Sequence, residues 1–215
     1  MRTHQIEFWS GDFGRIYTDR NTTVHEEWNR QYLEKYGVSR LDMNIEFLKD
    51  LPKNLRILEV GCNTGQQLEA LRLQGFNNIT GIELQLYAIK NARNRAHGVP
   101  VLQGTGFEIP FKTSSFDIVF TSGVLIHIAP EDLPVIMGEM FRCTSRLIWG
   151  FEYYADNMIE INYRGNTSVL WKADYASIFM KSFKELTLIK KKLYPYINEK
   201  ENSNVDCMYL LKKRN

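Results

Sequence analysis

The chain has few cysteines and no long apolar stretch, and both deficits restrict the class of protein that it can be. The three cysteines, Cys62, Cys143 and Cys207, are odd in number and widely spaced, so neither a disulfide framework nor a metal site is expected. No run of about 18 apolar residues exists, and the opening MRTHQIEFWSGDFG lacks the apolar core of a signal peptide. The sequence therefore predicts a protein of a reducing compartment, the cytoplasm by default, with no membrane partner.

The chain also lacks an excess of charge and several common catalytic motifs. Its net charge of +2 is too small to indicate a nucleic-acid partner. HExxH, GxSxG and paired CxxC motifs are missing, which disfavours hydrolases and zinc enzymes. No internal repeat or low-complexity linker interrupts the 215 residues, so we expect a single domain over 1–215.

From residue 55 onward, short apolar runs alternate with helical patterns. Near-continuous apolar strands are typical of a parallel sheet covered on both faces. The expected strands are LRILEVG, NITGIEL, VPVLQGT, part of SFDIVFTSGVLIHI, and SRLIWGFEYY; the helices between them are QQLEALRLQGF, LYAIKNARNRAHG and EDLPVIMGEMFRC. KELTLIKKKLYP and NVDCMYLLKK then predict a hairpin around the loop NEKENS, with the lysines of 190–192 protecting a sheet edge. The prediction is an α/β, doubly wound, mostly parallel seven-stranded sheet with an antiparallel C-terminal hairpin.

Residues 1–50 predict a helical lid ahead of the α/β core of 55–215. Val24, Trp28, Tyr32 and Tyr36 form one stripe that ends at Gly37, and a second stripe follows with Leu41, Ile45 and Leu48. We therefore expect two N-terminal helices before the first strand.

The stretch LEVGCNTGQQLEAL, residues 58–71, predicts a ligand-binding turn. Gly61 and Gly65 allow a tight turn before a helix N-terminus, and Glu83 at the end of the next strand suits a ribose diol. These features alone permit NAD, but the dinucleotide fingerprint needs a glycine where this chain has Asn63. A nucleoside with an amino-acid tail needs no such glycine, and Glu59 can then pair with an α-ammonium group.

LEVGCNTG resembles the first motif of class I S-adenosylmethionine-dependent methyltransferases, with Asn63 in place of the middle glycine. GIEL resembles their second motif, and QGTGFEIPFKTSSFDIVFTSGVLIHI resembles the third and fourth. The resemblance implies a Rossmann-like fold and S-adenosylmethionine as the cofactor. Because Thr105 replaces an aspartate that often binds adenine, adenine recognition is expected from backbone groups around 105–107. The cofactor-binding residues expected are Tyr17, Arg20, Glu59, Gly61, Cys62, Asn63, Gly65, Glu83, Leu84, Thr105, Gly106, Phe107 and Ser122.

Two of these residues come from the N-terminal segment WSGDFGRIYTDRN. Phe13, Tyr17 and Arg20 share a helical face, and the segment before the first strand often closes over the cofactor in class I methyltransferases. Tyr17 or Arg20 can meet the methionine carboxylate, while aromatic faces attract the sulfonium. The alternative is a helix packed by its aromatics, with Arg20 in solvent.

The acceptor side is expected after the fourth and fifth strands. His127 is the candidate catalytic residue, either as a general base or as a structural histidine that shapes the pocket. Tyr153, Tyr154 and Arg164 are the candidate substrate-binding residues, and the guanidinium can grip a carboxylate or phosphate. A loop-stabilising ion pair of Arg164 with Glu152 or Glu160 is the alternative.

A narrower resemblance spans nearly the whole chain. FWSGDFGRIYTDRN, GVLIHIAPEDLP and the segment EYY…YRG…LWKADYA resemble the pseudaminic acid biosynthesis-associated methylases. This implies methylation of a small anionic metabolite, a nonulosonic acid or a sugar-nucleotide intermediate of glycan synthesis, by a monomer or homodimer. The alternatives are O-methylation of a phosphonate or carboxylate, a non-catalytic cofactor-binding module, an NAD oxidoreductase and a nucleic-acid methyltransferase. The last lacks support, because TSGV at 121–124 is no base-flipping tetrad.

Overall fold

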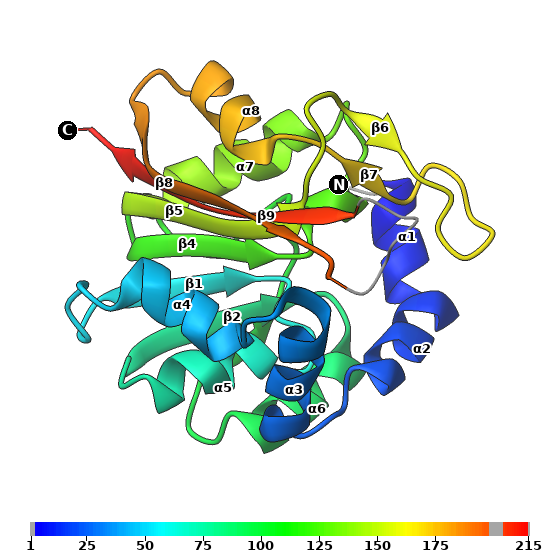
Figure 1. Cartoon of the computed structure of the whole chain (residues 1–215), viewed down its shortest axis with the longest axis horizontal. Helices are drawn as coiled ribbons and strands as arrows, with labels where there is room; N and C mark the ends of the chain where they lie inside the picture. Colours follow the sequence, from blue (N-terminus) through cyan, green and yellow to red (C-terminus); the bar gives the residue numbers. More distant parts are fainter. Residues whose placement is uncertain (1–2, 198–203, 215) are drawn as a thin grey trace. The chain divides into compact units, whose positions relative to one another are not determined.

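The computed structural model describes residues 3–197 and 204–214. The chain divides into two compact units, Met1–Thr105 and Gly106–Asn215, coloured blue to green and green to red in Figure 1. The expected hairpin loop NEKENS, residues 198–203, lies outside the described residues. The single-domain organisation stays a prediction.

The first unit begins with helices and continues as alternating strands and helices. Its helices are α1 (His4–Ser10), α2 (Asp12–Arg20), α3 (His25–Tyr36), α4 (Arg40–Leu48), α5 (Gln66–Leu73) and α6 (Leu86–Arg95). Its strands are β1 (Arg56–Val60), β2 (Asn78–Glu83) and β3 (Val101–Gln103). All three expected strands and both expected helices of this region are confirmed, within a few residues at their ends.

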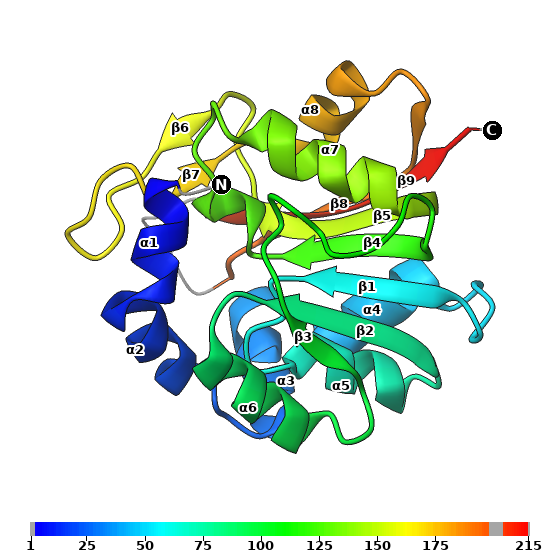
Figure 2. The same cartoon turned by 180° about the vertical axis from the view of Figure 1, so that it is seen from behind.

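The three strands of the first unit are parallel and lie in the order β3-β2-β1. Four of the five residues of β1 are buried, as expected of a strand covered on both faces. Helix α6 packs against β3 (Figure 2), and α5 packs against β2. Because β1 and β2 pair in register, the residues after Val60 and at Glu83 emerge at the same edge. The glycine turn and the acidic strand end therefore lie together.

The N-terminal region holds four helices rather than the two expected. The predicted end of α3 is confirmed, because Gly37 takes a left-handed conformation with φ 72°. The predicted stripe of α4 is only partly correct: Leu48 is buried and Leu41 half-buried, but Ile45 is 41% exposed, and the buried face also contains Arg40, Met43, Asn44 and Phe47. Two polar side chains occupy this buried face because, as described below, they meet polar groups of the core.

The second unit contains the remaining strands and two helices. Its elements are β4 (Phe116–Ser122), the 3-10 turn η1 (Leu125–His127), α7 (Leu133–Cys143), β5 (Thr144–Tyr153), β6 (Ile159–Glu160), β7 (Trp171–Lys172), α8 (Tyr175–Ser182), β8 (Leu186–Pro195) and β9 (Val205–Lys213). β4 and β5 are parallel, whereas β9 is antiparallel to both β5 and β8. The C-terminal antiparallel pair is thus confirmed. Helix α8 and the small β6–β7 ladder were not predicted.

Apart from the separate two-stranded β6–β7 ladder, the described residues of the two units contribute three and four strands, which gives the seven strands predicted, in a mostly parallel arrangement of the doubly wound α/β class. Among the residues that the structure describes, no helix is both long and apolar enough to cross a membrane. The same residues contain no group of three or more His, Cys, Asp or Glu side chains that could hold a metal ion.

Candidate functional site

The glycine turn after β1 contains three residues with positive φ. Gly61 and Gly65 have φ 74° and 76°, and Asn63 has φ 43°. Asparagine is among the few residues besides glycine that adopt this region readily, so Asn63 keeps the turn where the motif has glycine. A Cβ at Gly65 would lie 3.2 Å from both Cα and Cβ of Ala92, so the second glycine also permits close packing on α6.

The backbone amides of this turn are used within the protein. Gly61 N and Cys62 N donate to the Ile82 carbonyl at 2.9 and 3.0 Å, and Gly65 N donates to the Cys62 carbonyl at 2.8 Å. The Cys62 N–H is therefore engaged by the Ile82 carbonyl, and the predicted cofactor contact of Cys62 stays a prediction. What remains at the turn is the N-terminus of α5, which has no side-chain cap, together with the side chains of the turn.

Cys62 itself is a packing residue. A Cβ at Gly81 would lie 2.7 Å from Cys62 Sγ, so the thiol fills the space above that strand glycine. Burial raises the pKa of Cys62 well above its usual value, and the nearby Glu59 and Glu83 raise it further. A thiol held in its protonated form is a poor nucleophile.

Glu83 ties the turn to the loop after β2. Its Oε2 accepts from Asn63 N and its Oε1 accepts from Gln85 N, both at 2.9 Å. Burial raises the pKa of Glu83, and these amide bonds oppose that shift. Next to it, the Leu84 carbonyl accepts from Gln103 Nε2 at 3.1 Å. The carboxylate predicted to bind ribose thus has a fixed orientation.

Glu59 is buried in β1, and the positive charge of Arg40 on α4 partly neutralises its carboxylate. Burial raises the pKa of Glu59 well above its usual value, the Arg40 guanidinium lowers it, and Glu83 raises it. Arg40 lies beside the Gln67 amide, which is 3.1 Å from Asn44 Nδ2. This polar set explains the buried face of α4.

Two buried acceptor atoms at the turn stand out. Glu59 Oε2 and Asn63 Oδ1 have no hydrogen-bond partner among the described residues. Unsatisfied buried acceptors are rare and costly. The pair fits a ligand that brings N–H or O–H donors, as an α-ammonium group does.

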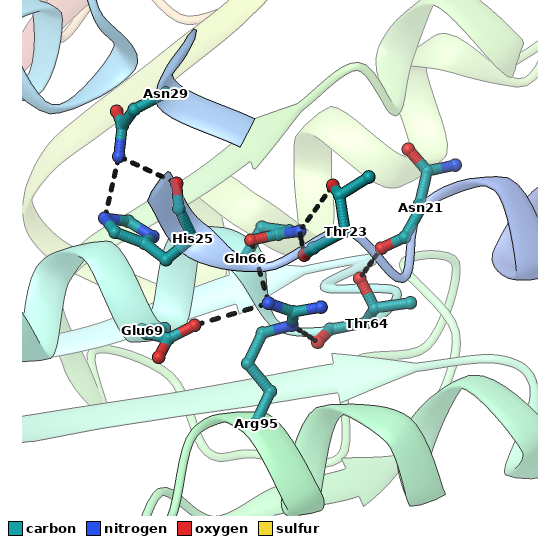
Figure 3. Close-up of polar contacts among 8 residues, drawn as sticks. All are labelled: Asn21, Thr23, His25, Asn29, Thr64, Gln66, Glu69 and Arg95. Carbon is teal, nitrogen blue, oxygen red and sulfur yellow. Dashed lines mark hydrogen bonds and ion pairs between the residues drawn. The ribbon is translucent and has the colours of Figure 1, made fainter. Parts of the chain in front are cut away.

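The chain between α2 and α3 is fastened to the glycine turn (Figure 3). Thr64 Oγ1 donates to the Asn21 carbonyl at 2.7 Å, and Gln66 Nε2 donates to the Thr23 carbonyl at 2.6 Å. These donors come from the turn and from the first residue of α5. Neither residue was predicted as functional, although both lie inside the motif that drew attention to the turn.

Arg95, at the end of α6, completes this network (Figure 3). Its Nε donates to the Thr64 carbonyl at 3.0 Å, and its Nη1 donates to Gln66 Oε1 at 3.2 Å and pairs with Glu69 Oε2 at 3.4 Å. Beside it, Asn29 Nδ2 bonds to His25 Nε2 at 2.9 Å and to the His25 carbonyl at 3.1 Å. Arg95 therefore braces the turn from the side opposite to the N-terminal segment.

The start of α2 has its own anchor beside Glu83. Gln85 Nε2 donates to the Trp9 carbonyl at 2.6 Å and to the Gly11 carbonyl at 3.0 Å. Residues 9–23, which we call the strap, are thus held near Glu83 at one end and at the glycine turn at the other. The side chains of both anchors are sequence neighbours of predicted cofactor-binding residues: Gln85 follows Leu84, and Thr64 and Gln66 flank Gly65.

Within the strap, the predicted common face of α2 is confirmed. The Arg20 guanidinium carbon lies 5.9 Å from the ring centre of Phe13 and 5.7 Å from that of Tyr17. Tyr17 also meets Trp9 edge to face at 5.2 Å. The contact of Tyr17 or Arg20 with a cofactor stays a prediction.

The predicted adenine segment falls on the division between the units, with Thr105 in the first and Gly106 and Phe107 in the second. Phe107 is buried, and Ser122 ends β4. Their roles in cofactor binding stay predictions.

His127 ends the η1 turn of the second unit. Its Nδ1 lies 2.8 Å from the Val169 carbonyl, which can only accept, so Nδ1 carries the proton and Nε2 the lone pair. Burial lowers the pKa of His127 to about 4. Tyr163 packs against the imidazole with ring centres 5.5 Å apart. The histidine is therefore neutral at physiological pH and firmly oriented.

The predicted acceptor residues lie after β5. Tyr154 Oη donates to Asp156 Oδ1 at 2.6 Å, and Lys191 Nζ lies 4.8 Å above the Tyr154 ring. The hydrogen bond to Asp156 is the main cause that raises the pKa of Tyr154 to about 12. The carbonyl of Tyr153 accepts from Ala173 N at 3.3 Å. Both tyrosines are therefore held in place by neighbouring loop residues.

Arg164 does not make the ion pair considered as its alternative. Its guanidinium carbon lies 5.9 Å from the Tyr163 ring centre, and its φ is 53°. Glu152 instead accepts from the amides of Val124 and Ile126, and Glu160 accepts from Ser168 N. A substrate role for Arg164 stays a prediction.

Comparisons with known proteins agree with the predicted class. Residues 58–146 match the family model described as a methyltransferase domain. The 24-methylenesterol C-methyltransferase 2 of Oryza sativa subsp. japonica is 29% identical over 125 residues, which are 55% of this chain and 31% of that protein. The chain spans about a third of the length of the plant and archaeal relatives that it matches.

Solved structures extend the likeness to nearly the whole chain. A Pyrococcus horikoshii protein has a TM-score of 0.68 at 15% identity, over 95% of this chain and 99% of its own. A SAM-dependent methyltransferase of Methanosarcina mazei has a TM-score of 0.60 at 16% identity, over 77% and 95%. The predicted class I methyltransferase fold is confirmed, and residues 58–146 match a methyltransferase domain.

Proposed function

We propose that the chain is an S-adenosylmethionine-dependent methyltransferase that acts on a small, anionic metabolite. The observation that carries this proposal is the pair of buried, unsatisfied acceptors at the turn, Glu59 Oε2 and Asn63 Oδ1. A donor with an α-ammonium group supplies both a positive charge for the carboxylate and N–H groups for the amide oxygen. The methyltransferase match over residues 58–146 supports the same cofactor.

Other predicted cofactor-binding residues suit the remaining parts of this donor. Glu83 is oriented by two amides and retains lone pairs for a ribose diol. Tyr17 and Arg20 are proposed to meet the methionine carboxylate, and the backbone at 105–107 to meet adenine. A dinucleotide is disfavoured, because the amides that would hold a diphosphate donate within the turn.

The chemistry needs alignment rather than a strong base. The bound donor supplies a methyl group on a positively charged sulfur. The protein then holds the acceptor in line with that group, and a large part of the rate follows from this orientation.

His127 favours an acceptor that is already anionic. Because burial lowers its pKa to about 4, its neutral Nε2 is a weak base for a sugar hydroxyl. It can still accept a hydrogen bond and orient a group. A carboxylate or phosphonate is already ionised before it attacks the methyl group, and an acidic hydroxyl loses its proton easily.

For the acceptor we propose Tyr153, Tyr154 and Arg164 as contacts, with the guanidinium on a carboxylate or phosphate. The whole-chain resemblance to pseudaminic acid-associated methylases supports a nonulosonic acid or a sugar-nucleotide intermediate of glycan synthesis. O-methylation of a phosphonate or carboxylate small molecule is the second candidate, favoured by the low basicity of His127. Nucleic acid and membrane are not among the proposed partners, and we propose a cytoplasmic monomer or homodimer.

Calorimetric titration tests donor binding. S-adenosylmethionine is expected to bind and NAD is not. Glu83→Ala is expected to weaken binding about tenfold or more, because a charge-assisted ribose contact is lost. Glu34→Ala removes an exposed carboxylate of α3 that pairs with Arg30, and should leave the affinity unchanged. Binding of NAD instead of S-adenosylmethionine would overturn the proposal.

An acceptor screen separates an enzyme from a non-catalytic binding module. Nonulosonic acids, sugar nucleotides and phosphonates are incubated with the protein and donor, and products are scored by the mass of one added methyl group. Matching release of S-adenosylhomocysteine supports catalysis. Tight donor binding without any methylated product across the screen favours the binding module.

A further inference from the structure

Glu152 is a buried carboxylate that no step of the proposed function uses. It lies next to the end of β5 and is 1% exposed. Its Oε1 accepts from Val124 N and its Oε2 accepts from Ile126 N, both at 3.3 Å. Each carboxylate oxygen therefore holds one amide of the segment that follows β4.

That segment carries His127. Gly123 has φ 68°, and its N–H donates to the Phe151 carbonyl at 2.8 Å. His127 N donates to the Val124 carbonyl at 2.9 Å, which closes the η1 turn. The turn of residues 123–127 is thus attached to β5 through the carbonyl of one residue and the carboxylate of the next.

The other side chains around Glu152 do not titrate near neutral pH. Thr121 of β4 interacts with its carboxylate, and Tyr175 of α8 and Tyr209 of β9 interact with it electrostatically. Burial raises the pKa of both phenols, and it raises the pKa of Cys207, the β9 residue opposite Glu152, to about 12. Burial lowers the pKa of His127, on the turn itself, to about 4.

The packing around the Glu152 carboxylate leaves it little room to move. A Cβ at Gly150 would lie 2.2 Å from Tyr209 Cζ, so the phenol ring sits directly over the backbone of β5. Tyr175 Oη is held by the Trp171 carbonyl at 3.1 Å. Any rearrangement of the carboxylate must therefore be passed to the turn that it holds.

We propose that Glu152 is a positioning residue whose carboxylate holds the turn of residues 123–127 and thereby sets the orientation of the His127 imidazole. Its importance for methyl transfer rests on the proposed function, whereas the coupling between the two side chains needs neither donor nor acceptor. The ionised carboxylate accepts from both amides, and hydrogen bonds to a charged acceptor are the stronger kind. The protonated acid must turn one oxygen into a donor, which weakens one of these contacts.

The state of Glu152 changes within the physiological range. Burial raises its pKa to about 7, against the hydrogen bonds from the amides of the turn, which lower it. The proton lost on ionisation goes to solvent. The His127 environment is therefore expected to differ between pH 6 and pH 8, although His127 itself stays neutral over that range.

Nitrogen-15 NMR of histidine-labelled protein tests the coupling. The His127 signals are assigned by their loss in His127→Asn, and their shifts are followed from pH 5 to pH 9 without donor. The wild type is expected to show an inflection near pH 7. In Glu152→Gln, which keeps the shape of the side chain, this inflection should disappear.

The matched control is Glu139→Gln in the same unit. Glu139 also accepts a backbone amide, that of Ile109 at 2.8 Å, and pairs with Arg142. This variant should retain the His127 inflection near pH 7. Exchange of the Val124 and Ile126 amides should become faster in Glu152→Gln and stay unchanged in Glu139→Gln.

Two results would overturn the proposal. One is a wild-type His127 signal without any inflection near pH 7, and the other is an inflection that persists in Glu152→Gln. Far-ultraviolet circular dichroism confirms that each variant is folded before its spectrum is compared. Titration with S-adenosylmethionine is a separate measurement, so failure of the donor assignment leaves this result intact.

Discussion

At the scale of single residues, two buried carboxylates face opposite requirements. Glu59 has one oxygen that no described residue satisfies, whereas both oxygens of Glu152 accept backbone amides. An unsatisfied buried acceptor is tolerated where a ligand completes it, and a satisfied one holds structure. We therefore propose that Glu59 contacts the methyl donor and that Glu152 positions a turn of the protein.

Binding of S-adenosylmethionine is expected to lower the raised pKa of Glu59 and so to release protons in the pH range where the free carboxyl is still protonated. Burial raises the pKa of Glu59 in the free protein, and a nearby ammonium favours its ionised form. Calorimetry in phosphate and in Tris should therefore give different binding enthalpies, because the two buffers differ in their heat of protonation.

The control for this proton release is Glu59→Gln, which keeps the size of the side chain. The difference between the two buffers should shrink in this variant. Equal enthalpies in both buffers for the wild type would contradict the assignment of Glu59 to the ammonium group.

At the scale of elements, the strap of residues 9–23 is held by side-chain donors from outside it. Removing one donor should loosen the strap without unfolding β1 or β2. In Gln85→Ala, the two hydrogen bonds to Trp9 and Gly11 are lost. Limited trypsin digestion is expected to cut after Arg15 and Arg20 several-fold faster, since local opening controls access to the protease.

Gln31→Ala is the matched control for the strap, because Gln31 is an exposed amide of α3 that contacts Glu27. Its digestion pattern should equal that of the wild type. Equal cleavage rates at Arg15 in Gln85→Ala and wild type would show that the anchor does not restrain the strap.

The elements that the sequence predicted well are those with a strong apolar period. β1, β4 and β5 are mostly buried and β2 is half buried, so their apolar runs identified them. The buried face of α4 was missed because it holds Arg40 and Asn44, which are buried only through partners on other elements. Helix α8 and the β6–β7 ladder are short, at eight residues and two residues per strand, and gave no period to detect.

The same limit applies to the site. Glu59, Gly61, Gly65 and Glu83 could be selected as candidates from the sequence because each lies in or beside the end of a predicted strand, and their roles in binding stay predictions. Gln85 and Arg95 act through backbone carbonyls of residues far along the chain, Trp9 and Thr64. No local pattern indicates such partners, because the contact exists only after the fold has formed.

At the scale of the whole molecule, two buried groups, Glu152 and His127, make the free energy of unfolding change with pH in opposite directions. The pKa of Glu152 is raised to about 7, so the folded state binds more protons than the unfolded state, and stability falls as pH rises from about 4.5 to 7. The pKa of His127 is lowered to about 4, so the unfolded state binds more protons, and stability rises as pH rises from about 4 to 6.5.

Single variants should separate these contributions. The free energy of unfolding is measured in urea at pH 4 and pH 8, and the difference between Glu152→Gln and wild type is compared at the two pH values. From pH 4 to pH 8 this difference should move in favour of the variant by roughly 3 kcal/mol, at about 1.4 kcal/mol for each pKa unit. His127→Asn should change in the opposite direction. A pH-independent difference between Glu152→Gln and wild type would contradict a raised pKa for this carboxyl.

The acceptors that Thr64, Gln66 and Gln85 meet on the strap are mainly main-chain oxygens, those of Trp9, Gly11, Asn21 and Thr23. Every residue type carries such an oxygen, so most side chains along α2 can change without loss of these hydrogen bonds; Gly14 is the exception, because a Cβ there would lie 1.9 Å from the Trp9 carbonyl oxygen and 2.5 Å from Gln85 Nε2. The sequence of this helix can then vary while the glycine turn that is proposed to bind the methyl donor stays unchanged. Related chains can accordingly alter what the helix presents to an acceptor while preserving the three polar side chains, Thr64, Gln66 and Gln85, that secure it.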